Sequence, residues 1–245
     1  MQTDCKTIKK QFEKSMAEYD KNAVIQDFTA EKMLSELLKF SNNFESVLEL
    51  GVGTGLLTKK ASNVLKFEKY FGNDLIEKSE NYLKKYIPSA DFVCGNALKI
   101  KVPYKMNLVI SNAMFQWFDN LEKGLNTISE YIAKDGILAF STFTPENYKE
   151  IRDITGLTLN YMSKSEIEKV LTRLGFKILY CEEFRKNIKF SNSLEILAHM
   201  KKTGVNSLSE KVWDIKKIKG FCDKYSQKYP ELSLTYSPII VIAGK

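Results

Sequence analysis

The chain has 245 residues, of which 44% are hydrophobic, which is typical of one globular domain with a large core. It contains no apolar stretch approaching the roughly 18 residues that a membrane span needs, and its N-terminus has no apolar run typical of a signal peptide. Four scattered cysteines without a C-x-x-C pair, and a single histidine, argue against a zinc site or disulfide framework. We therefore expect no metal, no membrane association and a cytoplasmic protein.

The net charge is +7, from 37 basic and 30 acidic residues, and only three of the basic residues are arginines. This excess has two interpretations: a general bias toward lysine, or an acidic partner. Proteins that read nucleic-acid bases favour arginine for bidentate contacts, so the composition argues against a nucleic-acid partner.

Residues 1–40 are predicted to form two helices. Phe12, Met16 and Tyr19 recur at helical spacing, and a second amphipathic pattern follows over residues 33–38. Tyr19 and Gln26 flank a more polar joint between them. They are either ordinary helix residues or parts of an N-terminal lid over a ligand.

A short buried strand is predicted over Ser46–Leu50, followed by glycines at positions 51, 53 and 55 and by a helix over Leu56–Leu65. Glycines let the backbone turn sharply and approach a ligand closely. The helix begins with leucine where a dinucleotide fingerprint has its last glycine, and no Lys-Ser/Thr pair of a P-loop is present. The loop therefore favours a nucleoside ligand without a pyrophosphate. Its E-x-G-x-G-x-G pattern resembles the first motif of the class I S-adenosylmethionine (SAM) methyltransferases.

A second strand is predicted over Phe67–Asn73, and Asp74 follows it. Asp74 lies about 20 residues beyond the glycine loop, the spacing at which α/β nucleotide folds place a ribose-binding carboxylate. The alternative is an N-cap for a helix that starts near Ile76.

A third strand is predicted over Ala90–Cys94, and Asn96 and Ala97 follow it. Where Asn96 stands, the methyltransferases commonly carry an acid that receives the adenine amino group. Asn96 can accept that hydrogen bond through its side-chain oxygen, or Ala97 through its backbone.

The fourth strand, Met106–Ser111, leads into Asn112–Phe118, which holds three aromatic residues and a methionine beside an amide. Such a surface is able to hold an apolar sulfonium and exclude water. The alternative is core packing against the next helix, whose apolar positions are Leu121, Leu125, Ile128 and Ile132.

The rest of the chain is predicted to complete one α/β domain. We expect the helix to close at Gly136, Phe143–Met162 to form a cap too irregular for the core, and residues 185–233 to add two capped helices. The other expected elements are strands Ile137–Thr142, Phe176–Phe184 and Leu234–Ala243, a helix from Ser163 to Gly175, and helix caps at Asn192 and Ser207. The predicted parts are a lid (1–40), a core (41–184), a helical insertion (185–233) and a closing strand (234–245). The expected fold is a Rossmann-like class I methyltransferase with a seven-stranded, mostly parallel sheet and helices on both faces.

Several motifs resemble one branch of these enzymes, the malonyl-acyl-carrier-protein O-methyltransferases of biotin synthesis. The branch is indicated mainly by S-N-x-x-x-Q-W at residues 111–117 and K-x-x-G-x-N at residues 201–206. The resemblance also covers residues 12–26, 48–58, 140–143, 161–163 and 234–236.

The resemblance implies a role for each matching residue. Those on the methionine and ribose side of SAM are Glu49, Gly51, Gly53, Gly55 and Asp74; those beside adenine are Asn96 and Ala97; those bordering the sulfonium are Ser111 and Asn112; those from the lid are Tyr19 and Gln26; and those facing the substrate are Gln116 and Trp117. Tyr19, Gln116 and Trp117 are the catalytic candidates.

The implied reaction transfers a methyl group from SAM to the free carboxylate of a malonyl thioester. A carboxylate with a pKa of about 4 is already ionised at neutral pH, so no general base is needed. The implied partner is an acidic acyl-carrier protein, or malonyl-CoA, and the lysine excess would steer the acidic protein. The candidate docking residues are Lys201, Lys202, Lys216, Lys217 and Lys219, and Arg152 is a candidate for the substrate carboxylate.

Three other functions fit part of the sequence. A methyltransferase for another carboxylic acid would share the glycine loop and Asp74. An RNA methyltransferase would usually carry a motif such as N-P-P-Y where this chain has residues 111–114. The third alternative is a SAM-binding protein without activity.

Overall fold

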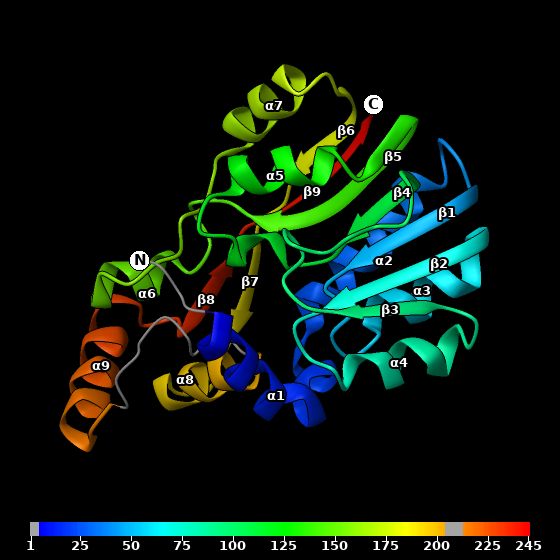
Figure 1. The fold of residues 1–245 in the computed structure, drawn as a ribbon. Coiled ribbons are helices and arrows are strands. Elements are labelled where there is room, and N and C mark those ends of the chain that lie inside the picture. The colour runs from blue at the N-terminus through cyan, green and yellow to red at the C-terminus, as the bar shows by residue number, and fades with distance from the viewer. Residues whose placement is uncertain (1–4, 204–212) are drawn as a thin grey trace.

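The computed structural model describes residues 5–203 and 213–245, and a seven-stranded sheet lies at its centre (Figure 1). The strand order is β3-β2-β1-β4-β5-β9-β6, with parallel pairing from β3 through β5 and antiparallel pairing of β9 with both its neighbours. The prediction of a mostly parallel seven-stranded sheet is confirmed. The strands of this sheet are β1 (Asn43–Leu50), β2 (Lys66–Asp74), β3 (Asp91–Cys94), β4 (Met106–Ser111), β5 (Ile132–Phe143), β6 (Lys177–Glu183) and β9 (Pro238–Gly244).

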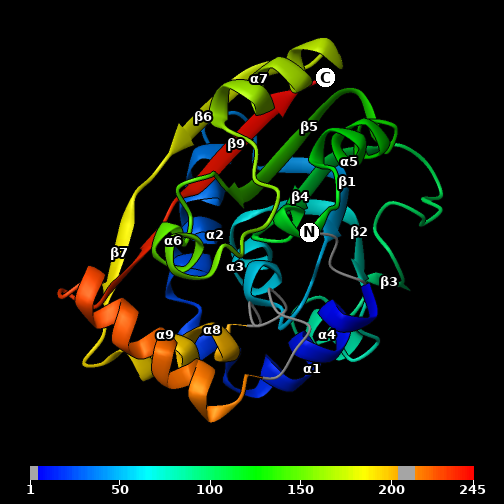
Figure 2. The same ribbon diagram turned by 90° about the vertical axis from the view of Figure 1, so that its left-hand side faces the viewer.

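Helices cover both faces of this sheet (Figure 2). One apolar cluster joins it to α2 (Val24–Leu37), α3 (Leu56–Val64) and α4 (Ser79–Tyr86). A second cluster, on the other face, joins it to α5 (Leu121–Ser129) and α7 (Lys164–Arg173). Central strands buried on both faces are continuously apolar, as the wholly buried Ile239–Ala243 segment of β9 illustrates.

A third apolar cluster lies beyond one end of the sheet (Figure 1). Its elements are α6 (Lys149–Thr155), α8 (Ser193–Lys202), α9 (Ile215–Lys228) and β8 (Ser233–Tyr236), and β8 pairs antiparallel with β7 (Lys186–Lys189). The first helix, α1 (Cys5–Asn22), packs against α8. No helix within the described ranges has the length and apolar character needed to cross a membrane.

Three predicted elements around the sheet differ from the structure. The helix after residue 120 does not close at Gly136, because it ends at Ser129 and Ile132 already begins β5. The apolar spacing from Ile128 to Ile132 fits one helical turn, and only the pairing of Ile132 with Met106 makes it part of a strand. The helix after β2 begins at Ser79 rather than near Ile76.

The segment Phe143–Met162 is not too irregular for the core. It contains α6, and Phe143, Tyr148, Ile151 and Leu159 are buried in the third cluster. These residues pack against α8, α9 and β8, which are distant in sequence, so no local periodicity revealed their burial.

The C-terminal region also departs from prediction. The region of residues 185–233 contains the strand β7, and its second described helix is capped by Asp214. The cap predicted at Ser207 lies outside the described residues. The closing strand is divided: β8 pairs with β7, and β9 begins at Pro238 and enters the main sheet.

Candidate active site

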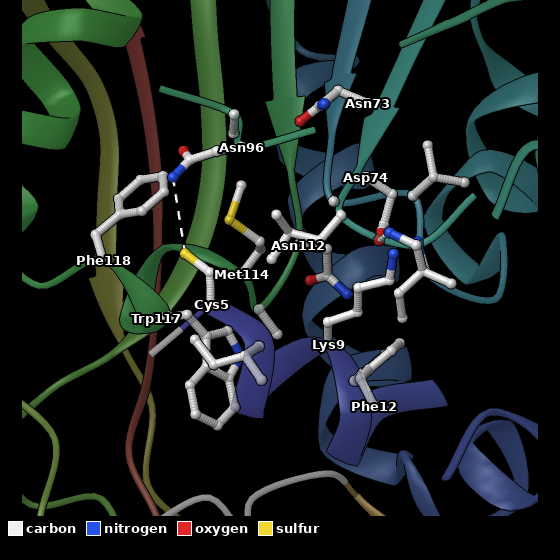
Figure 3. Close-up of a pocket in the computed structure, with 18 of the residues that line it drawn as sticks. Cys5, Lys9, Phe12, Asn73, Asp74, Asn96, Asn112, Met114, Trp117 and Phe118 are labelled. Carbon is white, nitrogen blue, oxygen red and sulfur yellow. Dashed lines mark hydrogen bonds between the residues drawn. The ribbon is translucent and has the colours of Figure 1, made fainter. Parts of the chain in front are cut away.

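A cavity of about 170 Å³ lies at the carboxyl ends of β1, β2, β3 and β4 (Figure 3). β1 has β2 on one side and β4 on the other, and ligands of open α/β sheets bind at such a topological switch point. The residues assigned from sequence that line this cavity are Tyr19, Gln26, Gly51, Gly53, Asp74, Asn96, Ala97, Asn112 and Trp117. Glu49, Gly55, Ser111 and Gln116 are not in its wall.

The glycine loop is shaped by backbone contacts that exclude a side chain at Gly51. Gly51 has a φ of +79°, and its N–H donates to the Asn73 carbonyl at 2.8 Å. A Cβ atom at this position would lie 2.7 Å from Cγ and 2.9 Å from Cβ of Met114, which also lines the cavity. The loop therefore brings backbone directly against the cavity, as the sequence predicted for this stretch.

Asp74 joins the glycine loop to the end of β2. One carboxylate oxygen accepts a hydrogen bond from the Gly53 N–H at 2.7 Å, and the other accepts from the Ile76 N–H at 2.9 Å. The carboxylate is 9% exposed, and burial raises its pKa despite these bonds. The interpretation of Asp74 as the N-cap of the next helix is wrong, because α4 starts at Ser79.

Glu49 lies beneath the loop and is not in the wall of this cavity. It is fully buried, and one carboxylate oxygen accepts hydrogen bonds from Thr58 at 2.7 Å and Tyr70 at 2.6 Å. Its other oxygen is buried without a partner among the described residues. Burial raises the pKa of Glu49 to about 7, so the group is partly protonated near neutral pH. In this structure Glu49 connects β1, α3 and β2 rather than facing a ligand.

This raised pKa makes stability depend on pH. The folded state binds a proton on Glu49 between pH 4.5 and 7 that the unfolded chain has released, so the contribution of Glu49 to the free energy of unfolding falls as pH rises through that window. The difference is at most about 3 kcal/mol, at 1.36 kcal/mol for each pKa unit. We expect Glu49→Gln, which resembles the protonated acid, to remove this dependence in urea unfolding at pH 5 to 8 without ligand. The exposed Glu45→Gln on the same strand is the control, and an unchanged pH dependence in Glu49→Gln would exclude Glu49 as its source.

Asn96 and Ala97 lie at the end of the cavity beyond β3. The side-chain oxygen of Asn96 accepts from the Leu98 N–H at 2.9 Å, and its amide nitrogen lies 3.8 Å from the sulfur of Cys5 (Figure 3). The carbonyl of Ala97 accepts from the Tyr131 hydroxyl at 3.0 Å. Asn96 thus has one oxygen lone pair in use, while both residues remain in the cavity wall.

Asn112 connects three elements at the centre of the site. Its side-chain oxygen accepts from Thr29 at 2.8 Å and Ser141 at 2.6 Å, and its amide donates to the Gln26 carbonyl at 2.9 Å. β4, β5 and α2 are thereby held together beside the cavity. Ser111 links the ends of β4 and β1, because its hydroxyl donates to the Leu50 carbonyl at 2.8 Å.

The side-chain oxygen of Gln26 is buried without a hydrogen-bond partner. An unsatisfied buried acceptor is costly, so the cavity is suited to a ligand that donates a hydrogen bond there. The α-ammonium of SAM is such a donor. The glycine loop and Asp74 suit the methionine and ribose portions of the same molecule. The residues present therefore fit SAM.

The two helices of the predicted lid contribute unequally to the cavity wall. α1 contributes Cys5, Ile8, Lys9 and Phe12 to the cavity wall, whereas most of α2 packs in the core. Lys9 extends from α1 into the cavity toward Asp74 (Figure 3). None of these four residues was among the predicted site residues. Ile8 and Lys9 lie four and three residues before Phe12, so they continue the helical stripe of Phe12, Met16 and Tyr19. This spacing could have predicted that they face the cavity.

A second cavity of about 20 Å³ adjoins the first. Five residues line both cavities: Phe12, Tyr19, Gln26, Ala113 and Trp117. The other residues of the second wall are Gln116, Phe143, Asn147, Tyr148, Leu159, Tyr161 and Thr203. None of these described residues carries a charge. Gln116 thus lies with Tyr19 and Trp117 at the second cavity, whereas Arg152 lines neither cavity and lies 3.8 Å from Glu146.

The described residues contain no cluster of three potential metal ligands. A glycine-lined cavity at the switch point of this sheet, joined to a second, uncharged cavity, is the arrangement expected of a class I methyltransferase. A family model described as a methyltransferase domain matches residues 23–180. The fold is similar to that of N-methyltransferase NodS from Bradyrhizobium japonicum in complex with S-adenosyl-L-homocysteine, with a TM-score of 0.59, 10% identity and 98% of each chain covered. It is also similar to geranyl diphosphate methyltransferase in complex with SAM (TM-score 0.54, 14% identity, 89% of this chain and 84% of that chain).

The sequence relatives narrow the class of methyltransferases to one family. The chain is 34% identical to a malonyl-[acyl-carrier protein] O-methyltransferase of Bacteroides thetaiotaomicron, over 97% of each protein. Proteins of the same name from Calditerrivibrio nitroreducens and Haemophilus influenzae are 34% and 31% identical, over 98% of this chain and 96% and 94% of theirs. The chain therefore belongs to the malonyl-[acyl-carrier protein] O-methyltransferase family.

Proposed function

We propose that this protein transfers a methyl group from SAM to the free carboxylate of a malonyl group carried by an acyl-carrier protein. The observation that carries the proposal is the pair of joined cavities, one fitted to SAM and one uncharged and polar. Tyr19, Gln26 and Trp117 lie in the shared wall, where a methyl donor and an acceptor would meet. The product would start pimeloyl synthesis for biotin.

In the reaction a carboxylate oxygen forms a bond to the methyl carbon while the bond from that carbon to the positively charged sulfur breaks, leaving a methyl ester and S-adenosylhomocysteine. The residues of the site have to hold and align the reactants. In the proposal Asp74 holds the ribose, Asn96 and Ala97 hold adenine, and Gly51 and Gly53 approach the methionine portion. Correct alignment of two reactants is worth up to about 7–11 kcal/mol of the barrier.

No proton has to be removed from an ionised carboxylate, and the site is consistent with this. His199, the one histidine of the sequence, lines neither cavity and is hydrogen-bonded to Tyr236 at 2.6 Å. Burial lowers the pKa of His199 to about 4. It is therefore neutral at physiological pH, and its hydrogen bond to Tyr236 links α8 to β8.

The proposed partner is the acidic carrier protein, and exposed lysines of α8 and α9 are its proposed docking residues. Lys201, Lys216, Lys217 and Lys219 are exposed. Lys202 is the exception among the predicted docking lysines, because its ammonium lies 4.0 Å from Glu18 of α1. Lys202 is thus partly engaged within the molecule.

We expect the double substitution Lys201→Glu/Lys216→Glu to raise KM for malonyl-carrier protein about 3- to 10-fold, because it replaces attraction by repulsion at the rim. The effect should shrink as salt rises, since exposed charges are screened within about 8 Å at physiological ionic strength. KM for malonyl-CoA should change much less. The control is Lys99→Glu/Lys101→Glu on the β3–β4 loop, whose lysines are also exposed. An equal effect of both double variants would exclude docking at α8 and α9.

The function itself is tested with radiolabelled SAM, offered in parallel with malonyl-carrier protein, malonyl-CoA and bulk RNA. We expect base-labile label on a malonyl thioester, as a methyl ester requires. Label on RNA alone would refute the proposal, and so would SAM binding without transfer to any acceptor. Growth of a biotin-requiring strain that lacks this methyltransferase, when it carries the gene for this chain, would be independent support.

A further inference from the structure

The smaller cavity has a feature that the proposed function does not explain: its polar wall is made of hydroxyl and amide groups and carries no charge. Among the described residues, neither lysine nor arginine lines it. A substrate carboxylate is commonly bound by arginine, so the means of binding the malonyl carboxylate has to be sought in neutral groups.

The orientation of one such group follows from its hydrogen bonds. Asn147 is 2% exposed, and its side-chain oxygen accepts from the backbone N–H of Ser237 at 3.2 Å. A backbone N–H can only donate, so this bond fixes which end of the amide faces Tyr161. The amide nitrogen of Asn147 therefore donates to the Tyr161 hydroxyl, at 3.0 Å. The oxygen of Tyr161 is used as an acceptor, and its proton has no acceptor among the described residues.

Tyr19 offers a second free hydroxyl. It is 8% exposed, lines both cavities, and makes no hydrogen bond through its hydroxyl within the described structure. By contrast, the Tyr148 hydroxyl donates to Tyr236 at 2.8 Å, and the Thr203 hydroxyl donates to the His199 carbonyl at 3.0 Å. Tyr19 and Tyr161 are thus the two phenols of this wall whose protons remain available.

We propose that the smaller cavity is a carboxylate subsite in which the hydroxyls of Tyr19 and Tyr161 donate to the malonyl carboxylate, with Asn147 as a positioning residue. This inference rests on the proposed function. A water molecule needs about 10–15 Å³ of such space, so a cavity of about 20 Å³ has room for a small polar group and not for a longer acyl chain. Burial raises the pKa of Tyr161 to about 12, so its proton is retained at neutral pH.

Neutral donors also suit the chemistry of the carboxylate. A lysine or arginine partner would neutralise the anion and lower the energy of the oxygen's lone pair, which makes it a weaker nucleophile. Two hydroxyl donors offset part of the cost of desolvating the anion. Because these hydroxyls are uncharged, the positive charge of SAM in the adjoining cavity remains the counter-ion of the carboxylate.

The test compares substrates with and without the carboxylate. We expect Tyr161→Phe to raise KM for malonyl-carrier protein about 10-fold or more, the effect of losing a hydrogen bond to a charged group. Acetyl-carrier protein lacks the carboxylate, so its inhibition constant against malonyl-carrier protein should stay within about twofold of the unmodified protein. The dissociation constant of SAM should also be unchanged, which shows that the variant is folded. Tyr104→Phe, in neither cavity, is the matched control.

A second variant reverses the donor. Asn147→Asp would present a carboxylate that accepts a hydrogen bond from the Tyr161 hydroxyl and places a negative charge beside the cavity, so KM for the malonyl substrate should rise further than in Tyr161→Phe. Equal changes for the malonyl and acetyl species in both variants would overturn the subsite, because a general packing defect does not distinguish them. If the unmodified protein methylates no malonyl thioester, the proposed function fails. If it does and KM is unchanged in Tyr161→Phe, only this inference fails.

Discussion

Replacing Asp74 by alanine is expected to lower the affinity for SAM at least about 100-fold, because the two hydrogen bonds that we propose from the ribose to this charged acceptor would be worth about 1.5–3 kcal/mol each. The carboxylate also accepts from the N–H groups of Gly53 and Ile76, so the glycine loop loses its anchor to β2 in the same variant. Isothermal titration calorimetry with SAM and with S-adenosylhomocysteine measures the loss for substrate and product separately.

Asp91→Asn provides the control for Asp74, because Asp91 is an exposed acid at the start of the neighbouring β3 and lies outside the cavity. The affinity of this variant should equal that of the unmodified protein. Asp74→Asn adds a second comparison. Its amide has a single oxygen, which can accept from only one of the two N–H groups, so the SAM affinity of this variant should be intermediate. An affinity within threefold of the unmodified protein in Asp74→Ala would show that Asp74 shapes the loop without binding the ribose.

Gly51→Ala is expected to damage both stability and SAM binding. A Cβ atom in the left-handed conformation costs about 1–2 kcal/mol, and here it would also meet Met114 Cγ at 2.7 Å and Cβ at 2.9 Å. The Met114 Cβ is attached directly to its backbone and cannot swing away as a side-chain end could, so the clash has to shift backbone that lines the cavity. We expect at least a tenfold loss of SAM affinity, on top of a lower free energy of unfolding in urea.

The chain contains a matched control for this strain. Gly156 has a φ of +72°, and a Cβ added there would have no atom within 4 Å. Gly156→Ala should therefore show the conformational cost alone and bind SAM normally. Met114→Ala removes Cγ and should partly restore SAM binding to Gly51→Ala. Equal losses in the Gly51 and Gly156 variants would mean that backbone strain, and not closeness to Met114, explains the glycine.

How much of the site could be predicted depends on whether its geometry is local. Gly51, Gly53 and Asp74 lie at strand ends whose order follows from a regular α/β pattern, so their spacing was sufficient to bring them together. Glu49 belongs to the same motif, but its position inside the strand directs it to Thr58 and Tyr70 instead of the cavity. The motif alone could not separate a residue that supports the loop from one that faces a ligand.

The errors in the fold have a common cause. Ile132 fits the helical spacing of Ile128, and Leu234 continues the apolar run of β9, so each was assigned to the element beside it in sequence. The pairing of Ile132 with Met106 and of Leu234 with Ile188 places them elsewhere. Pairing with a distant strand outweighs local periodicity, because it satisfies backbone hydrogen bonds and burial at once.

By itself the sequence determined the sheet, the nucleoside cavity at its switch point and the resemblance to one branch of methyltransferases, since these depend on short motifs and regular spacings. Only the tertiary structure decided what surrounds the acceptor. Tyr19, Asn147, Tyr161 and Thr203 meet in one cavity although they come from three segments that are far apart in sequence. The orientation of Asn147 depends on a backbone N–H of Ser237, some 90 residues away in sequence. No local pattern encodes such a contact, because it exists only when the third apolar cluster has packed.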